Sequence, residues 1–168
     1  TAPGQIEVVA RSTDGRLYHV RRLDGRWEAA RPLSIFAGVA TAPFRDPALA
    51  RAGNKLVLVF VDQRSRLIGM AFDLETGNWG SAFEMSGAGV LHAPAAVGCG
   101  DGRVDVAYVR RSDGALAQQS LSAMLTVFRP GEGSSGVSWS PVSTVGGQTG
   151  VGDPALICSG YRRLEQKH

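Results

Sequence analysis

The sequence contains few cysteines, almost no lysine and no long apolar segment. Only Cys99 and Cys158 occur among its 168 residues, and two cysteines alone cannot form a tetrahedral zinc site. All of the 18 basic residues except Lys55 and Lys167 are arginines. The arginines are scattered rather than gathered on one element, which does not favour binding to nucleic acid. No apolar run approaches the roughly 20 residues of a membrane-spanning helix.

Catalytic motifs are also missing. The sequence has no HExxH motif, no Walker loop, no Ser-His-Asp set and no glycine-rich phosphate loop that opens a helix. A glycosidase needs two carboxylates about 5–10 Å apart. Asp62 with Asp73, and Glu75 with Glu84, qualify by residue type only. We therefore predict that the chain is not an enzyme.

What the sequence does contain is a threefold repeat. Each cycle carries, in the same order, an apolar run, a leucine, a tryptophan and an X-Pro step. The leucines are 50 and 49 residues apart, which indicates one supersecondary unit present in several copies. The members of the three cycles are residues 6–10, Leu17, Trp27 and Pro47; residues 56–60, Leu67, Trp79 and Pro94; and residues 104–108, Leu116, Trp139 and Pro154.

The pattern within each cycle is typical of β-structure. Residues 6–10 and 104–108 alternate with period two, which predicts strands, and Asp14-Gly15 and Asp113-Gly114 predict hairpin turns. Four strands in about fifty residues are typical of a propeller blade, whereas a β-sandwich would not produce three copies in register. We predict an all-β protein, a β-propeller built of four-stranded blades. Each X-Pro segment is expected to start the fourth strand of its blade.

We expect a single propeller segment with repeats at about residues 4–50, 51–98 and 99–157, followed by the start of a next blade and a tail at 158–168. An insertion of about ten residues in the third repeat is placed in the glycine-serine stretch at 130–136. Propellers close with about 4–8 blades. The chain is therefore expected to form a homo-oligomer or to receive further blades from a longer chain.

Each cysteine follows an X-Pro segment, Cys99 after Pro94 and Cys158 after Pro154. Equivalent positions in neighbouring repeats would usually lie farther apart than the ~7 Å that a disulfide allows between Cα atoms. We therefore expect two buried free thiols.

Residues 6–20, followed by Gly25-Arg26-Trp27, resemble the repeat of bacterial seven-bladed propeller lectins of the PLL type, and residues 104–116 are a second copy. The likeness extends over about residues 4–164. It implies noncatalytic carbohydrate binding in grooves between blades, without a metal or a cofactor. Together with Thr1 in place of a start methionine, it favours a secreted or cell-surface location.

Sugar recognition requires an aromatic face and a few fixed polar groups. The tryptophans of the repeat are candidate platforms, with structural packing as the alternative: Trp27, Trp79 and Trp139. The resemblance implies polar pairs on the first and second strands, Glu7 with His19 and Asp105 with Gln118, whereas Val57 with Gly69 resembles an inactive site. The alternative for such a polar pair is a cross-strand contact that only stabilises the sheet.

The arginine-glutamate pair of the related six-bladed fucose lectins is missing from all three repeats. The predicted partners are therefore glycans of unspecified type. The alternative function is that of a protein-interaction or structural propeller domain in a larger secreted protein.

Overall fold

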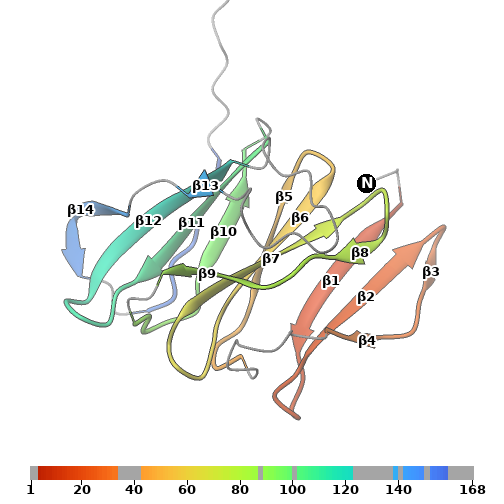
Figure 1. The fold of residues 1–168 in the computed structure, drawn as a ribbon, viewed down its shortest axis with the longest axis horizontal. Helices are drawn as coiled ribbons and strands as arrows, with labels where there is room; N and C mark the ends of the chain where they lie inside the picture. Colours follow the sequence, from red (N-terminus) through yellow and green to blue (C-terminus); the bar gives the residue numbers. More distant parts are fainter. Residues whose placement is uncertain are drawn as a thin grey trace, which may run out of the picture.

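The computed structural model consists of β-strands and turns that form three antiparallel sheets, one after another along the chain (Figure 1). It describes residues 4–33, 43–86, 89–99, 102–122, 138–139, 142–149 and 152–158. Within these residues there is no helix, and hence no helix long and apolar enough to cross a membrane. The predicted all-β class is confirmed.

Each sheet is built around a long central hairpin. The first contains β1 (Ile6–Arg11), β2 (Leu17–Leu23), β3 (Arg26–Trp27) and β4 (Arg31–Pro32). The central sheet contains β5 (Ala48–Ala52), β6 (Lys55–Val61), β7 (Leu67–Asp73), β8 (Asn78–Trp79) and β9 (Phe83–Ser86). The third contains β10 (Ala95–Gly98), β11 (Arg103–Val109), β12 (Ala115–Ser122), β13 (Ser138–Trp139) and β14 (Ser143–Thr149).

The strand registers show that the three sheets are structural copies. Each repeat leucine lies opposite the last residue of the preceding strand, and each repeat tryptophan lies opposite the same position of the long strand before it. The tryptophan pairs are Arg22 with Trp27, Phe72 with Trp79, and Leu121 with Trp139. Positions 50 residues apart in the first two sheets can therefore be compared directly.

The proline-led strands belong to a different sheet from the one we expected. Ala48 of β5 pairs with Val59 of β6, and Ala95 of β10 pairs with Ala107 of β11. Each such strand thus opens the next sheet instead of closing its own repeat. The reason is that the short strands around each tryptophan already occupy the far edge of β2, β7 and β12. The predicted insertion at 130–136 and the tail after residue 158 lie outside the described residues.

Burial explains why the apolar runs differ between repeats. Both faces of the central sheet are covered, so β6 and β7 are buried almost throughout and show no alternation. Leu58 and Phe60 pack toward the first sheet with Leu17, whereas Val57 and Val59 pack toward the third sheet. In the first sheet, β1 alternates between half-buried and exposed residues because one of its faces is uncovered.

The predicted Asp-Gly turns are present. Gly15 and Gly114 have φ of 77° and 68°, in the left-handed region that glycine adopts without strain. Ser65 occupies the equivalent position in the central sheet with φ of 61°. The fully buried carboxylate of Asp62 supports this turn, because one of its oxygens accepts hydrogen bonds from two backbone N–H groups of the turn.

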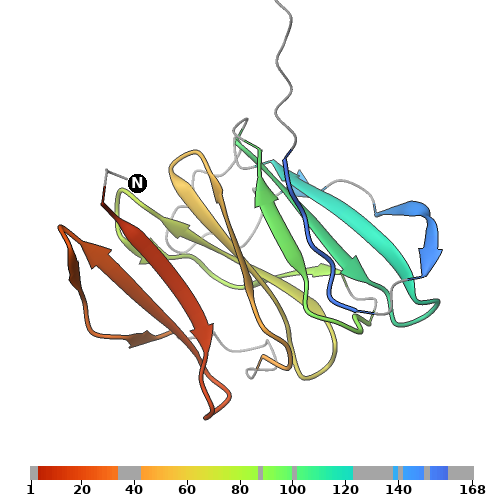
Figure 2. The ribbon, with the colours of Figure 1, turned by 180° about the vertical axis from the view of Figure 1, so that it is seen from behind.

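The proline-led strands of neighbouring sheets lie very close together. A Cβ atom on Gly98 of β10 would overlap the backbone carbonyl of Arg51 in β5. Residues 153–158 lie along β10 in a similar way (Figure 2), since Asp153 accepts a hydrogen bond from the Ala93 N–H at 2.8 Å. Glycine at position 98 is therefore required by the backbone approach.

The two cysteines form a disulfide, and the expectation of buried free thiols was wrong. Cys99 and Cys158 have Cα atoms 5.6 Å apart. Equivalent residues of neighbouring repeats can bond because both cysteines follow proline-led strands, where adjacent repeats approach most closely. The bond links the end of β10 to residues 153–158.

Replacing Gly98 with alanine tests this close approach. We expect G98A to lower the free energy of unfolding by about 2–3 kcal/mol, because the new methyl group meets backbone that cannot rotate away. G152A is the matched control, because a Cβ there has no neighbour within 4 Å, and its effect should stay within about 0.5 kcal/mol. Denaturant unfolding measures both. Equal effects of the two variants would contradict the described packing of β5 on β10.

The turn after β7 predicts an acid sensitivity. Backbone N–H groups of Thr76 and Glu75 donate to Asp73 and, with Lys55 nearby, hold the pKa of this carboxyl below its ordinary value of 3.8. A lowered folded-state pKa stabilises the fold above pH 3.8, and this stabilisation is lost as the pH falls from 3.8 through the folded-state pKa. The stability difference between wild type and D73N should therefore shrink below that pH. A difference that stays constant in unfolding curves down to pH 2 would contradict this prediction.

Candidate functional site

A pocket of about 260 Å³ lies between the first sheet and the central sheet. Its wall in the first sheet includes His19 and Arg21 of β2 and residues 28–33 around β4. Its wall in the central sheet comprises Phe72 of β7 and residues 77–79 around β8. The pocket thus lies where the short outer strands of two neighbouring sheets face each other.

Two of the lining residues, His19 and Arg21, belong to a buried polar network centred on Glu7, which does not itself line the pocket. The Glu7 side chain is only 2% exposed. One of its carboxylate oxygens lies 2.7 Å from His19 Nε2, and the other accepts hydrogen bonds from Arg21 Nε at 2.9 Å and Gln5 Nε2 at 2.7 Å. Period two along β2 places His19 and Arg21 on the same face as Glu7. A buried carboxylate with this many donors is held in one orientation.

Trp79 joins this network from the neighbouring sheet. Its indole Nε1 donates to His19 Nδ1 at 3.2 Å, although the two residues are 60 positions apart in the chain. Because an indole N–H can only donate, Nδ1 must accept, so the ring hydrogen is on Nε2 and points at Glu7. Trp79 also contacts the Phe72 ring, with ring centres 5.1 Å apart. The tryptophan is therefore fixed by its polar edge and by one aromatic neighbour.

Charged groups of both signs surround the opening. The Arg21 guanidinium lies 5.5 Å above the Phe72 ring centre while its Nε binds Glu7. Glu28 and Arg31 lie at the more exposed rim, with their charged groups 4.0 Å apart. Asn78 also lines the pocket, and its amide nitrogen donates to the Thr76 carbonyl at 3.2 Å. The pocket therefore offers fixed donors and acceptors next to an apolar aromatic surface.

Such a combination suits a neutral ligand that carries several hydroxyl groups. Hydroxyls pair with carboxylate, guanidinium and amide groups, and the apolar side of a sugar ring packs on an aromatic ring. Among the described residues, no group of three His, Cys, Asp or Glu side chains could hold a metal ion.

Three of the seven predicted site residues lie together in this place: Glu7, His19 and Trp79. Trp27 is on the opposite face of the first sheet, 55% exposed, with the Arg22 guanidinium 6.0 Å from its ring centre. Trp139 occupies the equivalent backbone position on β13.

The other predicted polar pair lies on the third sheet, far along the chain from the Glu7 network. Asp105 is buried and lies 3.2 Å from the Arg103 guanidinium. Gln118 is half-buried and lies diagonally from Asp105 across β11 and β12, as His19 does from Glu7. The two polar pairs are therefore equivalent in register.

The contact between the central and third sheets is apolar at the equivalent position. Val57 is fully buried, and a Cβ atom on Gly69 would meet the Phe83 ring at 2.6 Å. Val57 belongs to a cluster with Val104 and Val106 of the third sheet. The aromatic ring thus occupies the place that the His19 side chain takes in the first sheet.

Three of the four carboxylates considered for catalysis, Asp62, Asp73 and Glu84, have structural partners. Asp62 is fully buried and pairs with Arg66 at 2.8 Å, which raises the pKa of that guanidinium, and Arg66 also pairs with Glu84 at 2.9 Å. Asp73 lies 3.5 Å from Lys55.

Sequence reasoning missed several pocket residues. Arg21 could have been found, because it follows His19 by two positions on the same strand and so shares its face. No spacing in the sequence indicates that Glu28, Arg31 and Asn78 belong to the pocket. They reach the pocket only because two sheets meet there.

No family model matches the sequence, and no curated protein sequence matches it either. The fold is similar to that of a fucose lectin from Kordia zhangzhouensis in complex with methyl-fucoside: the TM-score is 0.55 at 9% identity, covering 87% of this chain and 92% of that one. It is also similar to AofleA from Arthrobotrys oligospora, with a TM-score of 0.55, 14% identity and coverage of 86% and 39%.

A third similar structure is a variant of the NanB sialidase from Streptococcus pneumoniae, with a TM-score of 0.54, 13% identity and coverage of 73% and 20%. The chain thus spans about two fifths of AofleA and one fifth of the sialidase, but nearly all of the Kordia lectin. At these identities the likeness shows a shared all-β fold.

The Glu7 network predicts a large effect of a small substitution. We expect E7Q to lower the free energy of unfolding by about 2–4 kcal/mol, because a buried carboxylate that receives three donors is replaced by an amide whose NH₂ group faces some of them. D46N is the matched control, since Asp46 forms an exposed ion pair with Arg11 at 3.3 Å and should change stability by less than about 0.5 kcal/mol. Chemical unfolding of both variants tests this, and an E7Q effect as small as that of D46N would contradict the network.

Proposed function

We propose that this protein is a noncatalytic carbohydrate-binding β-propeller, and that the pocket between the first and central sheets binds one sugar ring. The observation that carries the proposal is the placement of Trp79 beside the buried network of Glu7 and His19. A fixed aromatic surface next to oriented polar groups is the usual basis of sugar recognition. A volume of about 260 Å³ lies just below the range of roughly 300–1,000 Å³ typical of drug-sized ligands, which suits a single ring.

In the proposed complex, the apolar face of the sugar packs on the Trp79 ring. Arg21, Glu28 and Asn78 are available to its hydroxyl groups, because all three line the pocket. His19 acts indirectly, since both of its nitrogens are engaged by Trp79 and Glu7. The network thus fixes the aromatic surface before the ligand arrives, which lowers the entropic cost of binding.

The propeller assignment is supported by the repeat and by the similar structures. Three equivalent sheets are stacked through their faces, with their proline-led strands in closest contact, as expected for blades around an axis. The Kordia protein, which is described as a fucose lectin, matches over nearly its whole length. The missing arginine-glutamate pair leaves the type of sugar open to experiment.

A protein-interaction or structural propeller is the second candidate. The apolar contact between the central and third sheets favours it, because Val57 and Gly69 offer no polar group at the position of Glu7 and His19. A chain with a single pocket of this kind would bind monovalent glycans weakly, so that recognition would depend on several pockets acting together.

We also propose that the protein is secreted or displayed at a cell surface. The Cys99–Cys158 disulfide supports this, because disulfides persist in oxidising compartments and are rare in the cytosol.

A glycan array with a multivalent form of the protein tests the proposal. We expect wild type to bind, W79A to bind at least about tenfold more weakly, and W79F to retain much of the binding because it keeps an aromatic face. F44A is the matched control, as Phe44 is an exposed aromatic residue outside the pocket.

Three outcomes would overturn the proposed function. Wild type that binds no glycan would favour the protein-interaction candidate. Unchanged binding by W79A would remove the stacking role. Release of sugar from glycosides by the purified protein would show that the pocket is catalytic.

A further inference from the structure

The outer face of the first sheet is exposed where the equivalent face of the central sheet is buried. Ile6 and Val8 are 41% and 39% exposed, whereas Leu56 and Leu58, 50 residues later, are 5% and 0% exposed. Trp27 lies on the same outer face and is also exposed. In the central sheet, this face is covered by the first sheet. An apolar face of this composition therefore suits another sheet of the same kind.

The edge of the first sheet is open in the same way. β6 and β11 are each covered on one side by a proline-led strand, β5 or β10. Among the described residues, β1 has no strand on that side. Its backbone N–H and C=O groups at this edge offer a template for an added strand.

The chain also carries one proline-led segment that is paired with no described strand. Asp153-Pro154-Ala155-Leu156 repeats the sequence Asp46-Pro47-Ala48-Leu49, which leads into β5 and contains its first two residues. Residues 153–158 are held along β10 by the disulfide and by the hydrogen bond that the Ala93 N–H donates to the Asp153 carboxylate. Ile157 is 88% exposed, the highest value among the large apolar side chains described.

We propose that residues 154–158 of one copy of this chain pair with the open edge of β1 in a second copy. The register follows from the other two sheets, where the residue after proline pairs with equivalent positions, Val59 and Ala107. The corresponding position in β1 is Val9. Ala155 therefore pairs with Val9, and Leu156 pairs with Val8.

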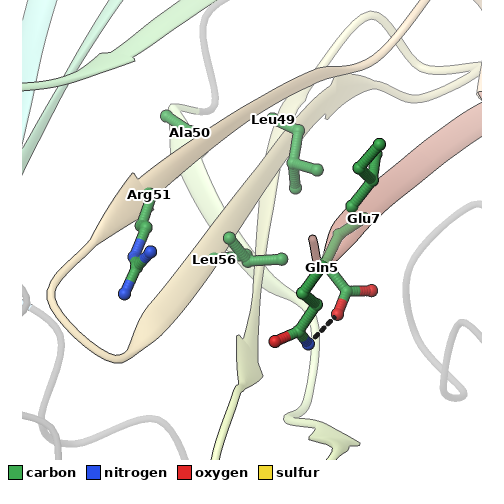
Figure 3. A pocket seen from close by; sticks show the side chains of 7 residues that line it. Gln5, Glu7, Leu49, Ala50, Arg51 and Leu56 are labelled. Atoms are coloured by element: carbon green, nitrogen blue, oxygen red, sulfur yellow. Dashed lines mark hydrogen bonds between the residues drawn. The ribbon is translucent and has the colours of Figure 1, made fainter. Parts of the chain in front are cut away.

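The same register brings Ile157 opposite Glu7, on the face that looks toward the central sheet. A groove of about 310 Å³ lies there, between the beginning of β1 and the strands β5 and β6 (Figure 3). Leu49 and Leu56 line it and point toward β1, and Gln5 and Glu7 lie on the other side. The isoleucine side chain of the second copy fills this groove, as Ala50 fills the space next to the third sheet.

Two copies of the chain can each donate this segment to the β1 edge of the other at the same time. Within the described residues, each copy offers one unpaired proline-led segment, residues 153–158, and one open edge at β1 of its first sheet. The disulfide keeps the donated strand attached to the third sheet, so the partner's first sheet is stacked on that sheet when the strand pairs. A closed ring of two chains then leaves no open edge of this kind.

This arrangement also accounts for the polar pair on the third sheet, a consequence that rests on the proposed function. Trp27 is equivalent to Trp79 in strand register, and Asp105 with Gln118 is equivalent to Glu7 with His19. When the first sheet of one copy stacks on the third sheet of the other, Trp27 faces that pair. A second glycan pocket would then contain residues of both copies.

Solution mass tests the strand donation independently of any glycan. Sedimentation equilibrium of the full chain is expected to give twice the 17.7 kDa of one chain. I157D should give the single-chain mass with an unchanged circular dichroism spectrum, because Ile157 is exposed within its own chain and only the association loses an apolar contact. V142D is the matched control, as Val142 is also exposed but lies outside both surfaces, and it should keep the wild-type mass.

A disulfide trap tests the register. The double variant V8C/L156C should form a covalent dimer under oxidising conditions, whereas R26C/L156C should not, because Arg26 lies on β3 away from the edge. A wild-type protein that stays at the single-chain mass, or an I157D variant that stays dimeric, would overturn the proposal. A monomeric protein whose β1 amides are protected from hydrogen exchange would also overturn the proposal, since another segment of the same chain would then cover the edge of β1.

Discussion

The structure depends on one interaction: successive sheets stack face to face and bury the apolar side chains between them. The central sheet is covered in this way on both sides, and its strands β6 and β7 are buried almost throughout. Neighbouring sheets approach most closely at their proline-led strands, where Gly98 lies against the backbone of Arg51. At their short outer strands they leave room for a pocket. The apolar core, the disulfide and the candidate site are therefore consequences of the same stacking.

The polar cluster at the contact between the first and central sheets occupies positions that are apolar at the contact between the central and third sheets, and this is why it is the candidate site. Burying Glu7 costs free energy unless its oxygens are paired, and His19, Arg21 and Gln5 supply the partners. At the second contact the same positions hold Val57 and Gly69, so the fold does not need the charges. Valine and glycine at the equivalent positions of the central sheet show that the fold itself does not require these polar residues. The network is therefore better explained by its effect on Trp79, whose ring it holds in place.

Much of the fold could be predicted because its determinants are local. Alternation in residues 6–10 predicted β1, the Asp-Gly turns predicted the hairpins, and the resemblance to propeller lectins implied Glu7 with His19 as a pair, which the register places on one face. What could not be predicted depends on how sheets meet. The sequence does not reveal that Trp79 reaches back to His19 of the preceding repeat. It also does not reveal how closely the proline-led segments of successive repeats approach one another, which is why Cys99 and Cys158 were not expected to bond.

The disulfide is the most direct reporter of the stacking, because it forms only if successive proline-led segments come within bonding distance. The measurement is a peptide map of the air-oxidised protein, alkylated in denaturant without reduction. The account predicts no alkylated cysteine and one linked peptide pair that contains Cys99 and Cys158 within a single chain. Two alkylated cysteines would contradict it, since adjacent repeats would then not converge at their proline-led strands.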